Sequence, residues 1–77
     1  MKLRFVGKDP ESGDHGCPSV WVDEERAELV IQGWKADEAT EVECLKAGPI
    51  PEHETVIRLP RRMIPLLREA LGDTDAL

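Results

Sequence analysis

The sequence predicts an α+β fold: a small antiparallel sheet of three or four strands, a short helix before the last strand, and a C-terminal amphipathic helix. Four short runs alternate between apolar and polar residues, as strands do. Two further runs carry apolar residues at helical spacing. The chain has 77 residues, the length of one domain, so we assign residues 1–77 to a single domain.

The N-terminal strand is expected at residues 3–6, where Leu3 and Phe5 share one face. Residues 7–16 are rich in Gly, Asp, Ser and Pro, which favour turns, and we expect a mobile loop there. Two strands at residues 19–23 and 27–34 then form a hairpin, whose connecting loop is kept in solvent by its acidic residues.

This hairpin carries apolar side chains on both of its faces, because side chains alternate along a strand. A chain this short buries only roughly 60% of its unfolded surface. We therefore expect one face to pack under a helix and the other to meet a second chain, although the loop at 7–16 or the helix at 37–46 is an alternative cover. The residues expected at this interface are Trp21, Val30, Gln32 and Trp34.

The first helix is expected at residues 36–46, with Asp37 as its N-cap and Gly48-Pro49 ending it. A last strand at 55–59 leads into the C-terminal helix, which begins near residue 63 because Pro65 is tolerated only in a first turn. Gly72 is expected to end this helix, leaving residues 73–77 as a frayed tail. From its apolar stripe we add Met63 and Leu67 to the interface.

The chain is acidic, with a net charge of −6 and a pI near 4.8. An acidic chain has no general electrostatic reason to bind polyanionic nucleic acid, so we do not expect direct binding. No run reaches the roughly 18 apolar residues of a membrane span, and no signal peptide is recognisable. With only two cysteines there is no dense disulfide framework, and we expect a cytoplasmic protein with reduced thiols.

Two kinds of chemical site can be weighed from the residue types. His15, Cys17, Cys44 and His53 include the ligand types that zinc prefers, but their spacing matches no zinc finger, so we assign no metal and no cofactor. A cysteine beside a histidine can act as a nucleophile, but no orienting residue or oxyanion motif accompanies it. We therefore do not expect an enzyme.

Four arginines gather near the C-terminal helix of this acidic chain. Such a cluster can hold an acidic partner or a phosphate. We favour pairing with neighbouring acids or plain solvation, because exposed ion pairs contribute little free energy. The four are Arg58, Arg61, Arg62 and Arg68.

Three segments resemble a group of small actinobacterial proteins that are encoded beside helix-turn-helix regulators and include the BldB-type developmental proteins. The first is the turn and strand DHGCPSVWV at 14–22, and the second is LVIQGWKAD at 29–37. The third is VIRLP at 56–60 followed by the helix at 63–71, and residues 36–51 form an insertion relative to shorter members.

The resemblance implies a non-enzymatic accessory regulator that forms a homodimer and acts through a DNA-binding partner. We therefore expect a protein–protein interaction module in transcriptional or developmental regulation. Two alternatives stay open, which are a binder of single-stranded nucleic acid using the aromatic sheet face and a small zinc-stapled domain.

Overall fold

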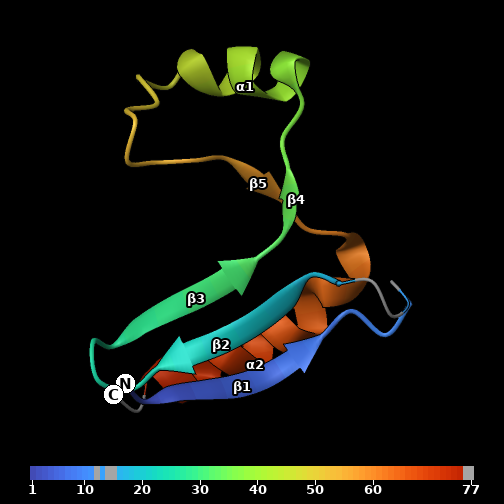
Figure 1. Cartoon of the computed structure of the whole chain (residues 1–77), viewed down its shortest axis with the longest axis vertical. Coiled ribbons are helices and arrows are strands. Elements are labelled where there is room, and N and C mark those ends of the chain that lie inside the picture. Colours follow the sequence, from blue (N-terminus) through green and yellow to red (C-terminus); the bar gives the residue numbers. More distant parts are fainter. Residues whose placement is uncertain (12, 14–15, 76–77) are drawn as a thin grey trace.

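The computed structural model describes residues 1–11, 13 and 16–75. Within these residues it contains a three-stranded antiparallel sheet, a second sheet of two strands and two α-helices, which confirms the predicted α+β class. The larger sheet has the order β1 (Leu3–Lys8), β2 (Ser19–Asp23), β3 (Glu28–Gln32). Figure 1 shows helix α2 (Ile64–Asp75) lying across one face of this sheet, while the second sheet and helix α1 form an arm that extends away from it.

The central strand β2 sets the core, because it pairs with both of its neighbours. Its Val20 and Val22 point towards α2 and are completely buried, together with Met63 and Ala70 from the C-terminal segment. Trp21, between the two valines, points to the opposite face and is only half-buried. One face of the sheet is therefore packed under a helix, as the apolar alternation predicts, and the other face is open.

Strand β1 is longer than expected because it contains a bulge. Phe5 pairs with Trp21 and Gly7 pairs with Val20, so Val6 is the additional residue. The strand resumes after the bulge and runs to Lys8, and the predicted loop start at residue 7 is wrong. Helix α2 approaches closely there, since a Cβ on Gly7 would lie 2.6 Å from Cδ2 of Leu66.

The expected strand at residues 27–34 is interrupted at Gly33. Strand β3 ends at Gln32, and the chain continues as β4 (Trp34–Lys35), which pairs with β5 (Ile57–Arg58) and not with the larger sheet. At Gly33 the backbone passes so close to β5 that a Cβ would lie 2.9 Å from the Arg58 carbonyl oxygen. The last strand thus joins the arm, and it covers two of the expected residues 55–59.

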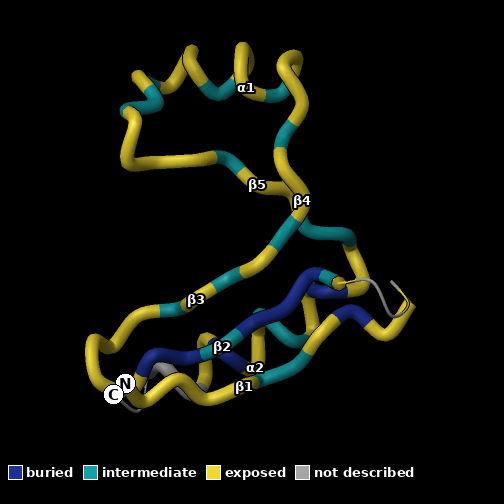
Figure 2. The backbone as a smooth tube through the Cα atoms, in the orientation of Figure 1, coloured by how far each residue is buried: buried dark blue, intermediate teal, exposed yellow. Residues whose placement is uncertain are grey.

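Helix α1 (Glu38–Leu45) lies in the arm and begins as predicted at its N-cap, where the Asp37 carboxylate accepts a hydrogen bond of 2.8 Å from the Thr40 amide. None of its residues is buried. Figure 2 shows that burial is confined to the layer formed by the larger sheet and α2, and no residue from 24 to 62 is buried. Helix α1 therefore does not cover the open sheet face.

Helix α2 follows a 3-10 turn, η1 (Arg61–Met63), and has Pro65 in its first turn as predicted. The predicted apolar stripe was Met63, Leu67, Ala70 and Leu71. Met63 and Ala70 are fully buried and Leu67 is half-buried as predicted, but Leu71 is 53% exposed and does not belong to the buried side. The helix continues through Gly72 to Asp75, so its predicted end at Gly72 is wrong. A glycine inside a helix costs only ~1 kcal/mol, and that cost does not by itself end a helix. No helix in the described part of the chain is long and apolar enough to span a membrane.

Candidate interaction surface

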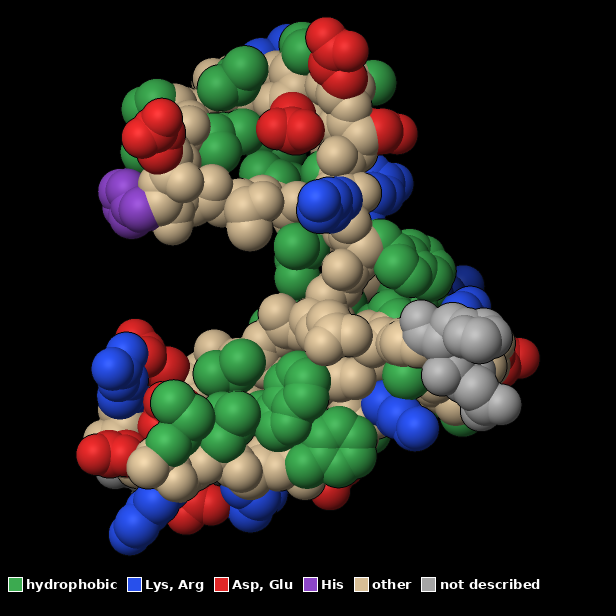
Figure 3. Space-filling view, viewed as in Figure 1, with side chains coloured by type: hydrophobic (Ala, Val, Ile, Leu, Met, Phe, Trp, Pro, Cys, Tyr) green, Lys and Arg blue, Asp and Glu red, His purple; other side chains and the backbone are tan. Residues whose placement is uncertain are grey.

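The open face of the larger sheet carries an apolar cluster, which we call the sheet patch. It is made by Leu3, Phe5, Trp21 and Val30, with Phe5, Trp21 and Val30 side by side across the three strands. The exposed fractions are 53% for Phe5, 40% for Leu3 and 36% for Val30. Figure 3 shows hydrophobic side chains gathered over β1, β2 and β3, with charged groups at the edge of the cluster. A continuous apolar cluster on an exposed face is typical of an interaction site.

The two aromatic rings of the sheet patch hold each other in place. The ring centroids of Phe5 and Trp21 lie 5.8 Å apart, and their planes are inclined by 55°. This separation and tilt are favourable for an aromatic pair. Because the rings are already packed, a partner that covers them has little side-chain motion to restrict.

Polar groups bound the sheet patch at both ends, and they are satisfied within the chain. The Asp23 carboxylate accepts hydrogen bonds of 3.0 Å from the amides of Glu25 and Arg26 in the hairpin turn. At the other end, the side-chain amide of Gln32 donates a hydrogen bond of 2.9 Å from Nε2 to the Cys17 carbonyl oxygen. Gln32 thus lies on the predicted face, but its side chain holds the segment before β2.

Trp34 does not share this face, contrary to the prediction. The break at Gly33 moves it into the arm, where it is 48% exposed. Its ring centroid lies 6.0 Å from Cζ of Arg62, within the range of a cation–π contact. The alternation rule placed Trp34 beside Val30 because it assumes an unbroken strand, and Gly33 was the only signal against that assumption.

Met63 and Leu67 are also not available to a partner in the way the sequence suggested. Met63 has no exposed surface and packs in the core, and Leu67 packs against that core. Apart from Leu71, the helical stripe was predicted correctly, but it faces the chain's own sheet. The exposed apolar residues of α2 are Ile64 and Leu71, with 42% and 53% exposed.

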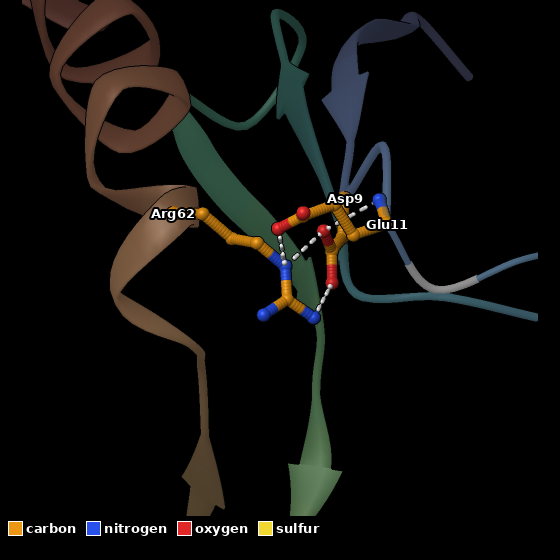
Figure 4. A network of polar contacts seen from close by, with 3 residues as sticks. All are labelled: Asp9, Glu11 and Arg62. Atoms are coloured by element: carbon orange, nitrogen blue, oxygen red, sulfur yellow. Dashed lines mark hydrogen bonds and ion pairs between the residues drawn. The ribbon is translucent and has the colours of Figure 1, made fainter.

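An ion pair that the sequence did not predict joins the end of β1 to the start of α2 (Figure 4). Arg62 donates to both oxygens of Asp9, with 2.5 Å from Nε to Oδ1 and 2.6 Å from Nη2 to Oδ2. Glu11 lies 3.3 Å from the same Nε, and the Asp9 side chain has no exposed surface. The hydrogen bond with Asp9 raises the pKa of Arg62 above its usual value. No local pattern identifies two partners that are 53 residues apart.

The remaining members of the arginine cluster divide between the arm and the surface. Arg58 donates from Nη1 to Oγ1 of Thr40 over 2.6 Å and so links β5 to α1. Arg61 and Arg68 are exposed. Two of the four arginines therefore hold parts of this chain together, and the cluster does not converge on one anion site.

The four residues considered as metal ligands are not brought together. His15 lies outside the described residues. Cys17 is half-buried in the segment before β2, while Cys44 is half-buried in α1 of the arm, and both thiols are free. The His53 side chain is 80% exposed. Within the described ranges, no group of three or more His, Cys, Asp or Glu residues is arranged to hold a metal ion.

A shallow cavity of about 360 Å³ lies where the larger sheet meets the arm. The Cys17 thiol is the one titratable side chain among its described lining residues, so the cavity presents no pair of groups for acid–base or nucleophilic chemistry. The lining is made by Gly16, Cys17, Pro18, Gln32, Gly33 and Trp34.

Comparison with protein-family models, with curated proteins and with solved structures found no match for this chain. The resemblance to the BldB-type group therefore stays a prediction.

Proposed function

We propose that the protein is a non-enzymatic protein–protein interaction module, a homodimer that acts as an accessory regulator through a DNA-binding partner of the helix-turn-helix class. The observation that supports this proposal is the sheet patch of Leu3, Phe5, Trp21 and Val30 on the open sheet face. Among the described residues no helix lies over this face, whereas the opposite face has α2.

The size of the core explains why a partner is needed. Among the described residues, the fully buried hydrophobic side chains are those of Val20, Val22, Met63 and Ala70. A core this small leaves a short domain marginally stable, and oligomerisation is one way in which such domains gain stability. Aromatic side chains are frequent anchors of protein interfaces, and the expected anchors here are Phe5, which is 53% exposed, and the half-buried Trp21 beside it.

A dimer that occupies the sheet patch leaves the outer face of α2 free for a regulator. That face exposes Ile64 and Leu71, two turns apart, with the exposed Arg68 between them. Apolar residues spaced by seven along a helix fit a groove on a second protein. Binding there would change the DNA affinity of the regulator by occupying a surface, without any chemical step.

The alternative partner for the sheet patch is single-stranded nucleic acid, because exposed rings on a sheet can stack on bases. That function needs basic residues along the aromatic face. Arg4 is engaged with Glu24 over 2.8 Å, and the whole chain carries a net charge of −6. These charges favour a protein partner.

The test is the mass of the purified chain in solution, measured by size-exclusion chromatography with light scattering at moderate salt. Phe5→Glu is compared with Leu71→Glu, since both side chains are 53% exposed and both changes add one negative charge. We expect a mass of two chains for the wild type and for Leu71→Glu, and a mass of one chain for Phe5→Glu.

A wild-type mass of one chain at every concentration would contradict the homodimer. An unchanged dimer in Phe5→Glu would remove the sheet patch from the interface. Loss of the dimer in both variants would show that added charge, and not the position of the change, controls association.

A further inference from the structure

We propose that two copies of this chain assemble reciprocally, with the arm of each copy packed on the sheet patch of the other. This inference rests on the proposed homodimer and specifies its geometry. It concerns a second uncovered surface, the exposed pair Val42 and Leu45 on helix α1, which we call the arm patch.

The arm patch is one helical turn long, and the described part of the chain leaves about half of its surface exposed. Val42 and Leu45 are 52% and 51% exposed, and positions three apart on a helix lie on the same side. Thr40 and Cys44, on the other side of α1, are half-buried towards the rest of the arm. An isolated helix of eight residues is marginal in water and depends on tertiary packing, and in the described part of the chain α1 receives this packing mainly on its Thr40–Cys44 side.

The overall dimensions show that the chain does not close on itself. Its radius of gyration is 13.8 Å, whereas a compact domain of this length has ~11.5 Å. Figure 3 shows a hollow between the arm and the lobe that carries the sheet patch, so the molecule is concave on this side. The chain thus has two apolar patches that do not touch each other.

The base of the arm prevents the chain from covering its own sheet patch. At Gly33 the backbone packs against the Arg58 carbonyl oxygen and the side chains of Ile57 and Leu59. Arg62, fixed by Asp9, lies over the Trp34 ring on the same part of the chain. The arm is held in its extended direction, so this chain's own arm does not reach its sheet patch.

The area needed for a stable dimer favours this geometry over face-to-face pairing of two sheet patches. Three strands ~4.8 Å apart with five residues at ~3.3 Å cover roughly 240 Å² of flat face. Doubling this value for side-chain relief still leaves it below the ~800 Å² per partner of a standard interface. In the reciprocal arrangement each copy buries its sheet patch and also a matching area of its arm, centred on the arm patch. Two-fold symmetry forms this contact twice, so each copy buries about twice the area that face-to-face pairing buries.

Cross-linking of single-cysteine chains tests the geometry. In a background of Cys17→Ser and Cys44→Ser, one chain carries Val30→Cys on the sheet patch and a second, size-tagged chain carries Val42→Cys on the arm patch. The two chains are mixed, allowed to exchange, and treated with a short bismaleimide. We expect the product that joins the tagged and untagged chains to dominate. As a matched control, Glu43→Cys replaces Val42→Cys, because Glu43 is the next residue on α1 and points away from the arm patch.

The outcomes separate this inference from the proposed homodimer. A product formed by Val30→Cys alone, in a sample that has the mass of a dimer, would show face-to-face pairing and overturn the reciprocal geometry. A dimer with no product between Val30→Cys and Val42→Cys, or with equal yield from Glu43→Cys, would overturn it too. A wild-type mass of one chain would overturn both proposals.

A second variant keeps the test independent of cysteine chemistry. Leu45→Glu changes an exposed residue and leaves the core unchanged, so it should fold as the wild type does. We expect it to weaken dimerisation by about tenfold or more, a change of ~1.4 kcal/mol. An unchanged dissociation constant for Leu45→Glu would remove the arm from the interface.

Discussion

The buried ion pair between Asp9 and Arg62 should contribute more to stability than any other polar contact described above. The Asp9 carboxylate is completely removed from solvent, and it receives two hydrogen bonds from Arg62 and one of 3.0 Å from the Glu11 amide. The Arg62 side chain keeps 38% of its surface in water. The two partners are therefore unequal, and their removal should have unequal effects.

Arg62→Met keeps most of the aliphatic stem and removes the positive charge. The Asp9 carboxylate then stays buried with the hydrogen bond from the Glu11 amide but without the guanidinium, and removing one side of a buried ion pair costs about 3 kcal/mol. A domain of 77 residues has a total stability of only ~4–12 kcal/mol, so the loss should lower the melting temperature by about 12 °C or more. Asp9→Asn should be milder, because the exposed part of Arg62 can be hydrated.

Urea unfolding followed by tryptophan fluorescence measures both variants and the double variant. We expect Arg62→Met to be the more destabilising single change, and the double change to cost less than the two single costs added together. Arg61→Met is the matched control, since Arg61 is the exposed neighbour in η1. If Asp9→Asn costs more than Arg62→Met, or if Arg61→Met has the same effect as Arg62→Met, the reasoning from burial is refuted.

Three further outcomes follow from the structure. Gly33→Ala should destabilise the chain by about 1–3 kcal/mol, because its Cβ would meet the Arg58 carbonyl oxygen at 2.9 Å. In the same urea assay, Gly72→Ala should stabilise the chain by up to ~1 kcal/mol, because Gly72 lies within α2 with open space around it. The pKa of Asp37 is lowered first by the side-chain hydrogen bond with Thr40 and then by the hydrogen bond from the Thr40 amide. The stabilisation of α1 by Asp37 is therefore complete above the usual carboxyl pKa and is lost as pH falls through the lowered pKa. The NMR shift of the Thr40 amide should report this change with pH, and Asp37→Asn should abolish it. Two chains that each have a net charge of −6 should associate more strongly as the salt concentration is raised, because salt screens their repulsion. Phosphate-driven binding to single-stranded nucleic acid would weaken instead, so titrations at two ionic strengths distinguish a protein partner from a nucleic-acid partner.

Local patterns in the sequence were sufficient to predict most helices and strands and to identify the buried side of the sheet. Alternation in β2 separated the buried Val20 and Val22 from Trp21, and helical spacing identified Met63 and Ala70 as members of one stripe. The N-cap at Asp37 was also predicted, because the signal and its partner lie within one turn. In each case the cause of the structure lies within a few residues of its effect.

Contacts between distant segments produced the errors at Gly33 and Asp9. The break at Gly33 depends on β5, which follows it by more than twenty residues, and the burial of Asp9 depends on Arg62. The extent of the sheet patch was underestimated for the same reason. Leu3 and Phe5 were correctly placed on one face of their strand, but only the register of β1 against β2 brings them beside Trp21.

Assembly can be tested without unfolding the chain, because the contacts that stabilise the fold lie apart from the two patches. Stability depends on the core under α2 and on the Asp9–Arg62 pair, and none of these groups lies on the sheet patch or the arm patch. Leu45 is more than half exposed, so replacing it removes little packing from the monomer, whereas replacing Phe5 also removes its ring contact with Trp21. A Leu45 variant that loses association should therefore keep the wild-type unfolding midpoint when both proteins are compared at concentrations where they are monomers. A shared loss of midpoint and association in the Leu45 variant would mean instead that folding and assembly are one process in this chain.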